Sequence, residues 1–146
     1  MTPIDILLIT SQIEALNADY WLEVDRRDGV NAHEYFVEDG VYTTTARARQ
    51  GRAAIAEFYS SRRGLGPRTS RHVATNHRVT VKDTHHAEAD WILMLHAADG
   101  QAVLPSEPAI LIADVHDVCL LCGDGRWRYV ARTIDAVFKS STPTTG

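Results

Sequence analysis

GLGP, residues 64–67, is the stretch that decides the fold, because it separates a helical half of the chain from a β-rich half. Glycine and proline together end a helix predicted over residues 52–63. Upstream, Thr2-Pro3 is a typical helix start, and Asp28-Gly29 ends or kinks this first helix. Apolar side chains recur along it every three or four residues, at Ile9, Ile13, Leu16, Tyr20 and Val24. A short second helix is expected over residues 31–36.

The β-rich half contains four long runs, predicted as strands over residues 69–81, 87–97, 110–121 and 127–138. A further strand is expected at residues 41–45, before the last helix. Helices followed by long strands predict an α+β domain. We expect a strongly curved antiparallel or mixed sheet, wrapped around three N-terminal helices to form a cone with an open-ended pocket. Residues 1–140 are predicted to form this single domain, and residues 141–146 a disordered tail.

Length, net charge and hydropathy argue against a nucleic-acid or membrane partner. A chain of 146 residues fits one domain, and a net charge of −4 gives no attraction to nucleic acid or to anionic membranes. No segment approaches the roughly 20 apolar residues of a membrane span, and the start MTPIDILLIT lacks the basic region of a secretory signal. We therefore expect a cytoplasmic protein with no nucleic-acid and no membrane partner.

No metal or cofactor motif is apparent in the sequence. Cys119 and Cys122 form a single C-x-x-C pair, and a zinc site would need two more soft ligands at suitable spacing. Neither a P-loop nor a G-x-G-x-x-G string is present. The expectation is a protein with no metal and no cofactor.

Two short strings carry candidate chemistry. VDRRDG, residues 24–29, places Asp25 at the end of the first helix, and SRHVATN, residues 70–76, places His72 inside a predicted strand. A carboxylate that orients an imidazole forms an acid/base pair able to move protons near neutral pH. A hydrogen-bonded core histidine and an ordinary helix-end carboxylate would give the same strings, so the residues alone leave both interpretations open.

Regular strand alternation assigns the neighbours of His72 to two faces. Ala74, Asn76 and Arg78 would share its face, while His77 would point outward or into an interface. Asn76 is then a candidate for the pocket lining, or for satisfying a neighbouring backbone group.

Three more side chains are candidates for contacting a ligand. Arg132 lies in the apolar stretch VARTIDAVF, where a buried guanidinium must be paired. Its partner would be Asp135, another internal acid, or an anionic or enolate oxygen of a substrate. Tyr20 and Trp21 lie on the pocket side of the first helix, where each could stack on a planar ligand or pack in the core.

The order of elements, together with VDRRDG, DGVY (residues 39–42), SRHVATN and DGRWRYVAR (residues 124–132), resembles the nuclear transport factor 2-like superfamily. The resemblance extends over residues 4–138 and is strongest to the SnoaL-like branch. That branch holds scytalone dehydratase, hexachlorocyclohexane dehydrochlorinase, polyketide cyclases and the small subunits of ring-hydroxylating dioxygenases. One fold hosts many chemistries, so the resemblance is specific for the fold and weak for function.

The resemblance implies roles for particular residues. His72 matches the histidine that takes the substrate proton, and Asp25 the aspartate that supports it. Arg132 resembles an arginine of the dehydrochlorinase pocket, and His96 lies near a second active-site histidine of the dehydratase. Tyr20 and Tyr42 are possible counterparts of the tyrosines that hold a catalytic water. The resemblance also implies a homo-oligomer, either a dimer or a trimer.

The favoured function is a cofactor-independent lyase or isomerase acting on a small apolar cyclic molecule, aromatic or polyketide-like. His72 would be the general base, with Arg132 and Tyr20 or Tyr42 holding the leaving oxygen or enolate. One alternative is a polyketide cyclase or epoxide-opening enzyme in which Asp25 is itself the acid/base group. Others are a non-catalytic subunit resembling the dioxygenase small chains, and a ligand-binding module without turnover.

Overall fold

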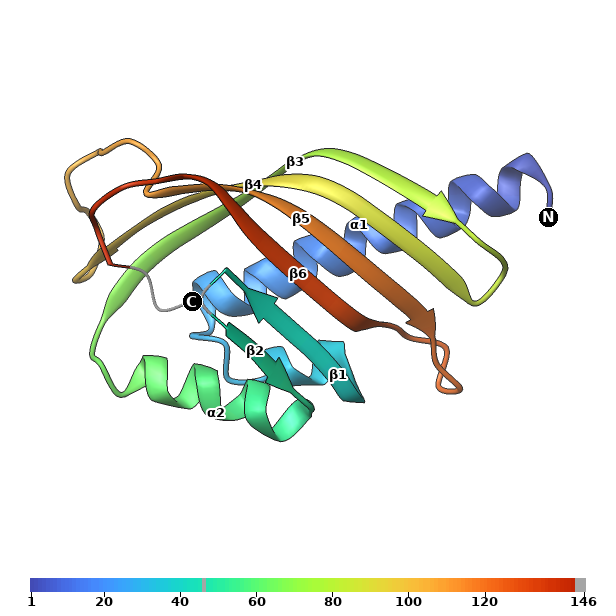
Figure 1. Ribbon diagram of the computed structural model, residues 1–146, viewed down its shortest axis with the longest axis horizontal. Helices are drawn as coiled ribbons and strands as arrows, with labels where there is room; N and C mark the ends of the chain where they lie inside the picture. The colour runs from blue at the N-terminus through green and yellow to red at the C-terminus, as the bar shows by residue number, and fades with distance from the viewer. Residues whose placement is uncertain (46, 144–146) are drawn as a thin grey trace.

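The computed structural model describes residues 1–45 and 47–143 (Figure 1). Two α-helices, α1 (Pro3–Arg26) and α2 (Arg52–Arg63), flank a single 3-10 turn, η1 (Ala32–Tyr35). The strands are β1 (Phe36–Thr44), β2 (Arg47–Gln50), β3 (Arg68–Val81), β4 (His86–Asp99), β5 (Leu111–Leu121) and β6 (Trp127–Lys139). The long helices and strands lie where the sequence predicts them, but three details differ. The short second helix is a 3-10 turn, β1 begins at Phe36 instead of at residue 41, and β2 was not predicted. The last three residues of the predicted disordered tail lie outside the described residues.

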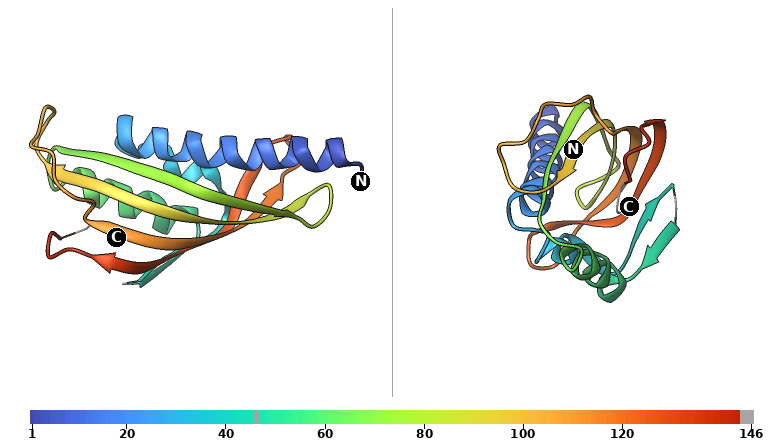
Figure 2. Two further views of the ribbon diagram at one scale, coloured as in Figure 1. Left: turned by 90° about the horizontal axis from the view of Figure 1, so that it is seen from above. Right: turned by 90° about the vertical axis from the view of Figure 1, so that its left-hand side faces the viewer.

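The sheet is mixed and remains open. Its strand order is β2-β1-β6-β5-β4-β3, with β1 and β6 parallel and every other pair antiparallel. The sheet curves around α1, and α2 lies below the end of the sheet formed by β1 and β2 (Figure 2). The α+β architecture with a curved sheet is thereby confirmed, and its hollow side faces the helices.

The first helix begins with a reciprocal cap. The Thr2 hydroxyl accepts a hydrogen bond from the Asp5 backbone N–H at 3.1 Å, and the Asp5 carboxylate accepts one from the Thr2 backbone N–H at 2.7 Å. The predicted apolar face packs onto the sheet, with Ile9, Ile13, Leu16 and Tyr20 buried. Among the described residues, no helix combines the length and apolarity needed to cross a membrane.

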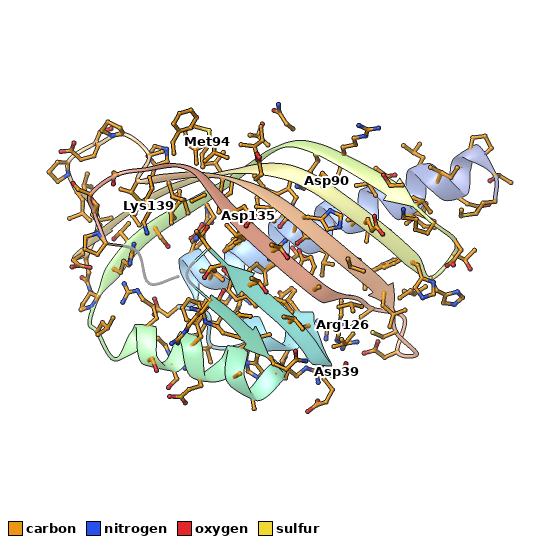
Figure 3. All side chains as sticks on the ribbon, viewed as in Figure 1. Asp39, Asp90, Met94, Arg126, Asp135 and Lys139 are labelled. Atoms are coloured by element: carbon orange, nitrogen blue, oxygen red, sulfur yellow. The ribbon has the colours of Figure 1, made fainter. Side chains whose placement is uncertain are left out.

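Strand β4 shows how the sheet separates its two faces. Trp91, Leu93 and Leu95 are buried toward the helices. Asp90 and Met94 alternate with them and lie on the opposite face (Figure 3). A residue's parity in β4 therefore tells whether its side chain can reach the hollow of the sheet.

Strand β3 breaks this alternation at a bulge. Thr75 pairs with Ile92, but the next pair joins Arg78 to Asp90, and Asn76 has φ of 57°. The extra residue shifts the facing of everything after it. The predicted facing of Asn76 and His77 is thus wrong, because Asn76 is exposed while His77 turns toward α1.

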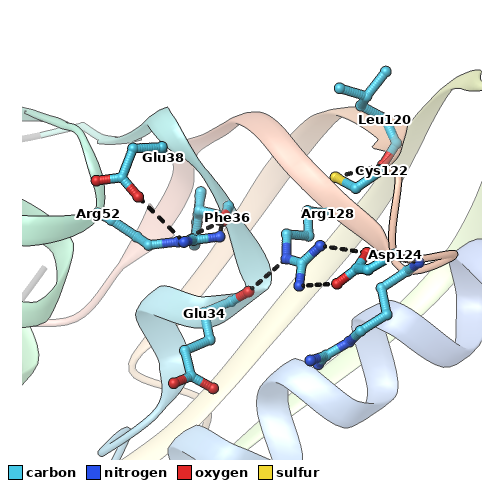
Figure 4. Close-up of polar contacts among 9 residues, drawn as sticks. Glu34, Phe36, Glu38, Arg52, Leu120, Cys122, Asp124 and Arg128 are labelled. Carbon is cyan, nitrogen blue, oxygen red and sulfur yellow. Dashed lines mark hydrogen bonds and ion pairs between the residues drawn. The ribbon is translucent and has the colours of Figure 1, made fainter.

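Two arginines tie the smaller elements to the sheet (Figure 4). Arg52, the first residue of α2, donates two hydrogen bonds to the carbonyl of Phe36, at 3.0 and 2.7 Å. Arg128 of β6 binds both oxygens of Asp124 and donates to the carbonyl of Glu34 at 3.1 Å. These contacts hold α2 against β1 and the 3-10 turn against the β5–β6 hairpin.

Gly29 is a position where the fold requires glycine, since φ is +66° and an added Cβ would lie 2.5 Å from the ring of Tyr59. We expect Gly29→Ala to lower the free energy of unfolding by about 2–4 kcal/mol, from backbone strain plus overpacking. Gly125→Ala is the matched control, because φ there is +80° with no atom within 4 Å of the added Cβ. Urea denaturation of both variants checks this, and equal losses would show that the contact with Tyr59 costs nothing.

Candidate active site

A cavity of about 690 Å³ lies between the helices and the hollow side of the sheet. Its volume suits a small organic ligand. Apolar and aromatic side chains form much of its wall, among them Trp21, Val24, Tyr42, Phe58, Tyr59, Leu93, Leu95, Leu111 and Ile134. Polar groups on the wall include Ser70 and His72, both from β3. The cavity therefore combines an apolar surface with a titratable side chain.

Asp25 binds β3 through three hydrogen bonds. Its Oδ1 accepts from the Ser70 hydroxyl at 2.7 Å and lies 2.6 Å from Nδ1 of His72. Its Oδ2 accepts from the His72 backbone N–H at 2.8 Å. The side chains of His72 and Asp25 are only 12% and 7% exposed. The carboxylate at the end of α1 thus fixes both the backbone and the ring of the histidine.

This geometry assigns the protons of the pair. Burial raises the pKa of Asp25, but the hydrogen bonds and charge of His72, with the Ser70 hydroxyl, outweigh burial and hold that pKa below its usual value. Asp25 is accordingly a carboxylate at neutral pH and can only accept, so Nδ1 of His72 must be the donor. In the neutral imidazole, Nε2 then carries the lone pair. Because His72 lines the cavity, that nitrogen is placed for base chemistry.

Trp21 fixes the plane of the imidazole. Its ring stacks on His72 with centroids 4.0 Å apart and planes 5° from parallel. Trp21 and Asp25 are four residues apart on α1, so they lie on the same side of the helix. One helical turn therefore supplies both the stacking surface and the hydrogen-bond acceptor for His72.

Two tyrosines, Tyr42 and Tyr59, are part of the cavity wall. Tyr20 is fully buried behind the wall, where its hydroxyl forms a short hydrogen bond with the hydroxyl of Tyr59. Burial raises the pKa of both Tyr42 and Tyr59. Each of the two remains a neutral O–H group at physiological pH, able to donate a hydrogen bond. Of the two predicted tyrosines, Tyr42 lines the cavity and Tyr20 only supports Tyr59.

Arg132 is in the core and not in the cavity wall, so the predicted substrate contact does not fit its position. The side chain is 0% exposed. It donates two hydrogen bonds to Asp117, at 2.7 and 2.8 Å, and one to Asn17 at 2.6 Å. The internal acid is Asp117 of β5, whereas Asp135 is exposed on β6 (Figure 3). Nε and Nη2 are thus paired inside the protein, while Nη1 is buried without a hydrogen-bond partner among the described residues.

Of the remaining predicted ligand contacts, His96 and Asn76 lie outside the cavity wall. His96 is exposed because it has the same parity in β4 as Asp90 and Met94, which face away from the helices. Asn76 lies at the bulge of β3, next to a separate shallow hollow shared with His77. Trp21 is in the wall, but one face of its ring is covered by His72.

Several wall residues were not predicted from the sequence. Ser70 lies two residues before His72, and same-face alternation in a strand was the signal that could have found it. Tyr59 of α2 is a further wall residue. Four basic side chains, Arg62, Arg63, Arg68 and Lys139, also line the cavity.

The lowered pKa of Asp25 makes a prediction about acid stability. Below about pH 5 the unfolded carboxyl, with a pKa near ~3.9, takes up a proton before the folded one does. The native protein therefore loses unfolding free energy as the pH falls, and Asp25→Asn lacks this component. We expect the stability gap between the two proteins to narrow as the pH falls from 5 toward 3. Urea titrations at each pH measure the gap. Asp114→Asn, at an exposed site, is the control, and an unchanging Asp25→Asn gap would contradict the assignment.

A second prediction concerns the buried pair of Arg132 and Asp117. Arg132→Met leaves a buried carboxylate without its cation, which should lower the unfolding free energy by about 3–5 kcal/mol. The double variant Arg132→Met/Asp117→Leu removes both charges and should recover much of that loss. Urea denaturation of the three proteins gives the comparison. An Arg132→Met protein as stable as the native one would restore a ligand-binding role for this arginine.

Known structures share this fold at low sequence identity. A scytalone dehydratase-like protein from Novosphingobium aromaticivorans superposes with a TM-score of 0.84 at 17% identity, covering 98% of this chain and 93% of that one. ActVI-ORFA from Streptomyces coelicolor gives 0.76 at 17% identity, covering 88% and 98%. An aromatic ring hydroxylase-like protein from N. aromaticivorans gives 0.75 at 19% identity, covering 94% and 93%. These similarities establish the fold and leave the reaction open.

No curated protein sequence matches the chain. The SnoaL-like domain, however, matches residues 5–133, which include every strand but the end of β6 and both members of the His72–Asp25 pair. On that match, this chain belongs to the SnoaL-like domain family.

Proposed function

We propose that this protein is a lyase or isomerase in which His72 removes a C–H proton from a small cyclic molecule held in the cavity. The observation that carries the proposal is the hydrogen bond that holds His72, a residue of the cavity wall, to Asp25 behind it. A base is useful there only if its tautomer and orientation are fixed before the substrate arrives. Asp25 and Trp21 supply those two constraints.

The first step is deprotonation next to a carbonyl group. Nε2 of His72 accepts the proton, and the C–H electron pair passes into an enolate. The imidazolium that forms is stabilised by the Asp25 carboxylate on Nδ1, at 2.6 Å. Because this contact is largely shielded from water, solvent screens the attraction between the two groups only weakly.

An elimination is completed by returning that proton. The enolate electrons form the new C=C bond as the C–O bond breaks, and the imidazolium protonates the departing hydroxyl group to give water. In an isomerase the same proton would return to a different carbon. Tyr42 and Tyr59 are the hydroxyl groups best placed to donate to the enolate or leaving oxygen, since burial keeps both protonated.

The lining favours a cyclic and mainly apolar substrate body. Leu93, Leu95 and Ile134 are almost fully buried parts of the wall, and Phe58 and Trp21 add aromatic surface. Such walls bind flat rings through burial of apolar area. The fold shared with a scytalone dehydratase-like protein is consistent with this class of substrate.

The alternative in which Asp25 is itself the acid/base group has weaker support. Each oxygen of its carboxylate already accepts hydrogen bonds from β3, and Asp25 lies behind Ser70 and His72 instead of in the cavity wall. The two hypotheses predict opposite variant patterns. If Asp25 were the acting group, its loss would abolish turnover while the loss of His72 would be mild.

Hydrogen–deuterium exchange tests the base directly, before any natural substrate is known. We expect the protein to accelerate exchange of the α-carbon hydrogens of a cyclic ketone such as 2-tetralone in D₂O, followed by mass spectrometry. His72→Gln should lower the enzymatic rate by about 10²–10⁴-fold, because general base catalysis contributes that much.

His96→Gln is the matched control, since it removes an exposed histidine from the opposite face of the sheet. It should retain the native rate. Circular dichroism of both variants confirms that they remain folded. A His72→Gln protein that exchanges the ketone at the native rate would overturn the proposal.

A further inference from the structure

We propose that the substrate carries an anionic group, a carboxylate or a phosphate, which binds to four basic side chains at the outer end of the cavity. This inference deepens the proposed function, because it concerns the same cavity. The chain has a net charge of −4, yet its cavity wall contains Arg62, Arg63, Arg68 and Lys139. Asp28 is the single acidic side chain among the lining residues that the structure describes.

The four cations come from three separate parts of the fold. Arg62 and Arg63 end α2, Arg68 begins β3, and Lys139 ends β6. Figure 1 shows that these segment ends gather on the left of the molecule, and Figure 3 labels Lys139 there. Arg62 and Arg68 are half-buried while Arg63 and Lys139 are exposed, which places the group where the cavity meets solvent.

None of the four is neutralised by a carboxylate within the described part of the chain. Arg62 donates to the backbone carbonyl of Gly66 at 3.3 Å, and Arg63 to that of Asp28 at 3.2 Å. No salt bridge involves Arg68 or Lys139 across residues 1–45 and 47–143. Burial and the nearby charge of Arg62 lower the pKa of Arg68, although the charge of Asp99, its cross-strand partner, raises that pKa. Positive charges that outnumber the nearby carboxylates are stabilised when an anion binds among them.

Arg49 adds a fifth positive charge behind the wall. Its guanidinium lies 3.9 Å from the ring centre of Phe58 and donates to the hydroxyl of Thr44 at 3.4 Å. Both of these residues line the cavity. Arg49 is only 6% exposed, its Nε has no hydrogen-bond partner among the described residues, and burial lowers its pKa. A buried cation next to the cavity raises the positive potential inside it.

Helix electrostatics explain only part of this arrangement. Arginines in the last turn of α2 interact favourably with the helix dipole, which accounts for Arg62 and Arg63 on structural grounds. The same argument does not apply to Arg68 or Lys139, which belong to strands. The convergence of all four on one cavity is better explained by a ligand of opposite charge.

The two ends of the cavity would then bind different parts of the substrate. The apolar body lies against Leu93 and Ile134, within reach of His72, and the anionic group stays near Arg68 and Lys139 at the opening. The anionic group thereby selects one orientation for a ring system that has no other polar anchor. Anchoring a non-reacting group is an effective means of positioning the reacting carbon.

Matched probes test the charge preference by calorimetric binding without any turnover. The ligands are 2-naphthoate, the neutral 2-naphthamide of nearly the same shape, and 2-naphthyl phosphate. We expect either anion to bind at least about tenfold more tightly than the amide at low salt, with a preference that falls as salt is raised. Tighter binding of the phosphate would identify a phosphorylated substrate, and tighter binding of the carboxylate an acid.

Variants locate the preference. The double change Arg68→Gln/Lys139→Gln should reduce the preference for the anion to about threefold or less and leave binding of the amide unchanged. Arg71→Gln/Arg78→Gln, at two exposed positions on β3, is the charge-matched control and should keep the native preference. Equal affinity for acid and amide in the native protein would overturn the proposal. So would a preference that the double variant retains.

These outcomes are separable from those of the exchange experiment. His72→Gln should lose exchange activity and keep its preference for anions, while Arg71→Gln/Arg78→Gln should keep both. A native protein that prefers anions but does not accelerate exchange would be a binding protein for the same anionic ligands. Exchange activity without anion preference would leave the base in place and refute the anionic substrate alone.

Discussion

The buried ion pair between Arg132 and Asp117 is the constraint on which the position of the first helix depends. Both groups are almost completely removed from water, which costs several kcal/mol per charge unless hydrogen bonds compensate. Asp117 accepts from Arg132 twice and from the indole N–H of Trp91, while Asn17 of α1 accepts the remaining bond of one guanidinium nitrogen. The hydrogen bond to Asn17 therefore forms only when α1 lies at one position along the sheet. An apolar contact alone would allow the helix to shift along the sheet.

The positions of the side chains around His72 depend on this placement of α1. Asn17, Trp21 and Asp25 follow one another at intervals of four residues, so they form a single ridge on α1. Fixing Asn17 against Arg132 fixes Trp21 over the imidazole and Asp25 against β3. The guanidinium also lies 5.1 Å from the Trp21 ring. Arg132 thus acts on His72 through the helix, although it takes no part in the cavity wall.

Local sequence rules predicted the fold well because its elements obey them. The cap at Thr2, the break at residues 64–67 and the long β-branched runs each have a local cause. The pairing of Asp25 with His72 needed the family resemblance as well, since 47 residues separate the two. The predicted side-chain directions in β3 were wrong after the bulge, where one extra residue interrupts the alternation of the strand. Asn76 adopts a left-handed conformation there, and nothing in RHVATNHR marks a bulge. Arg132 was misassigned because its partner, Asp117, is 15 residues away on the neighbouring strand.

The His72–Asp25 pair and the basic group at the cavity opening are built from different parts of the fold. The His72–Asp25 pair rests on α1 and the middle of β3, where hydrogen bonds and the core leave little freedom. The basic group rests on segment ends, where two of its members are exposed and two are half-buried. Under the proposed function, a change at Lys139 could therefore alter which substrate is held without altering the base. Proton transfer would then depend on the core of this fold, and recognition on the opening of the cavity.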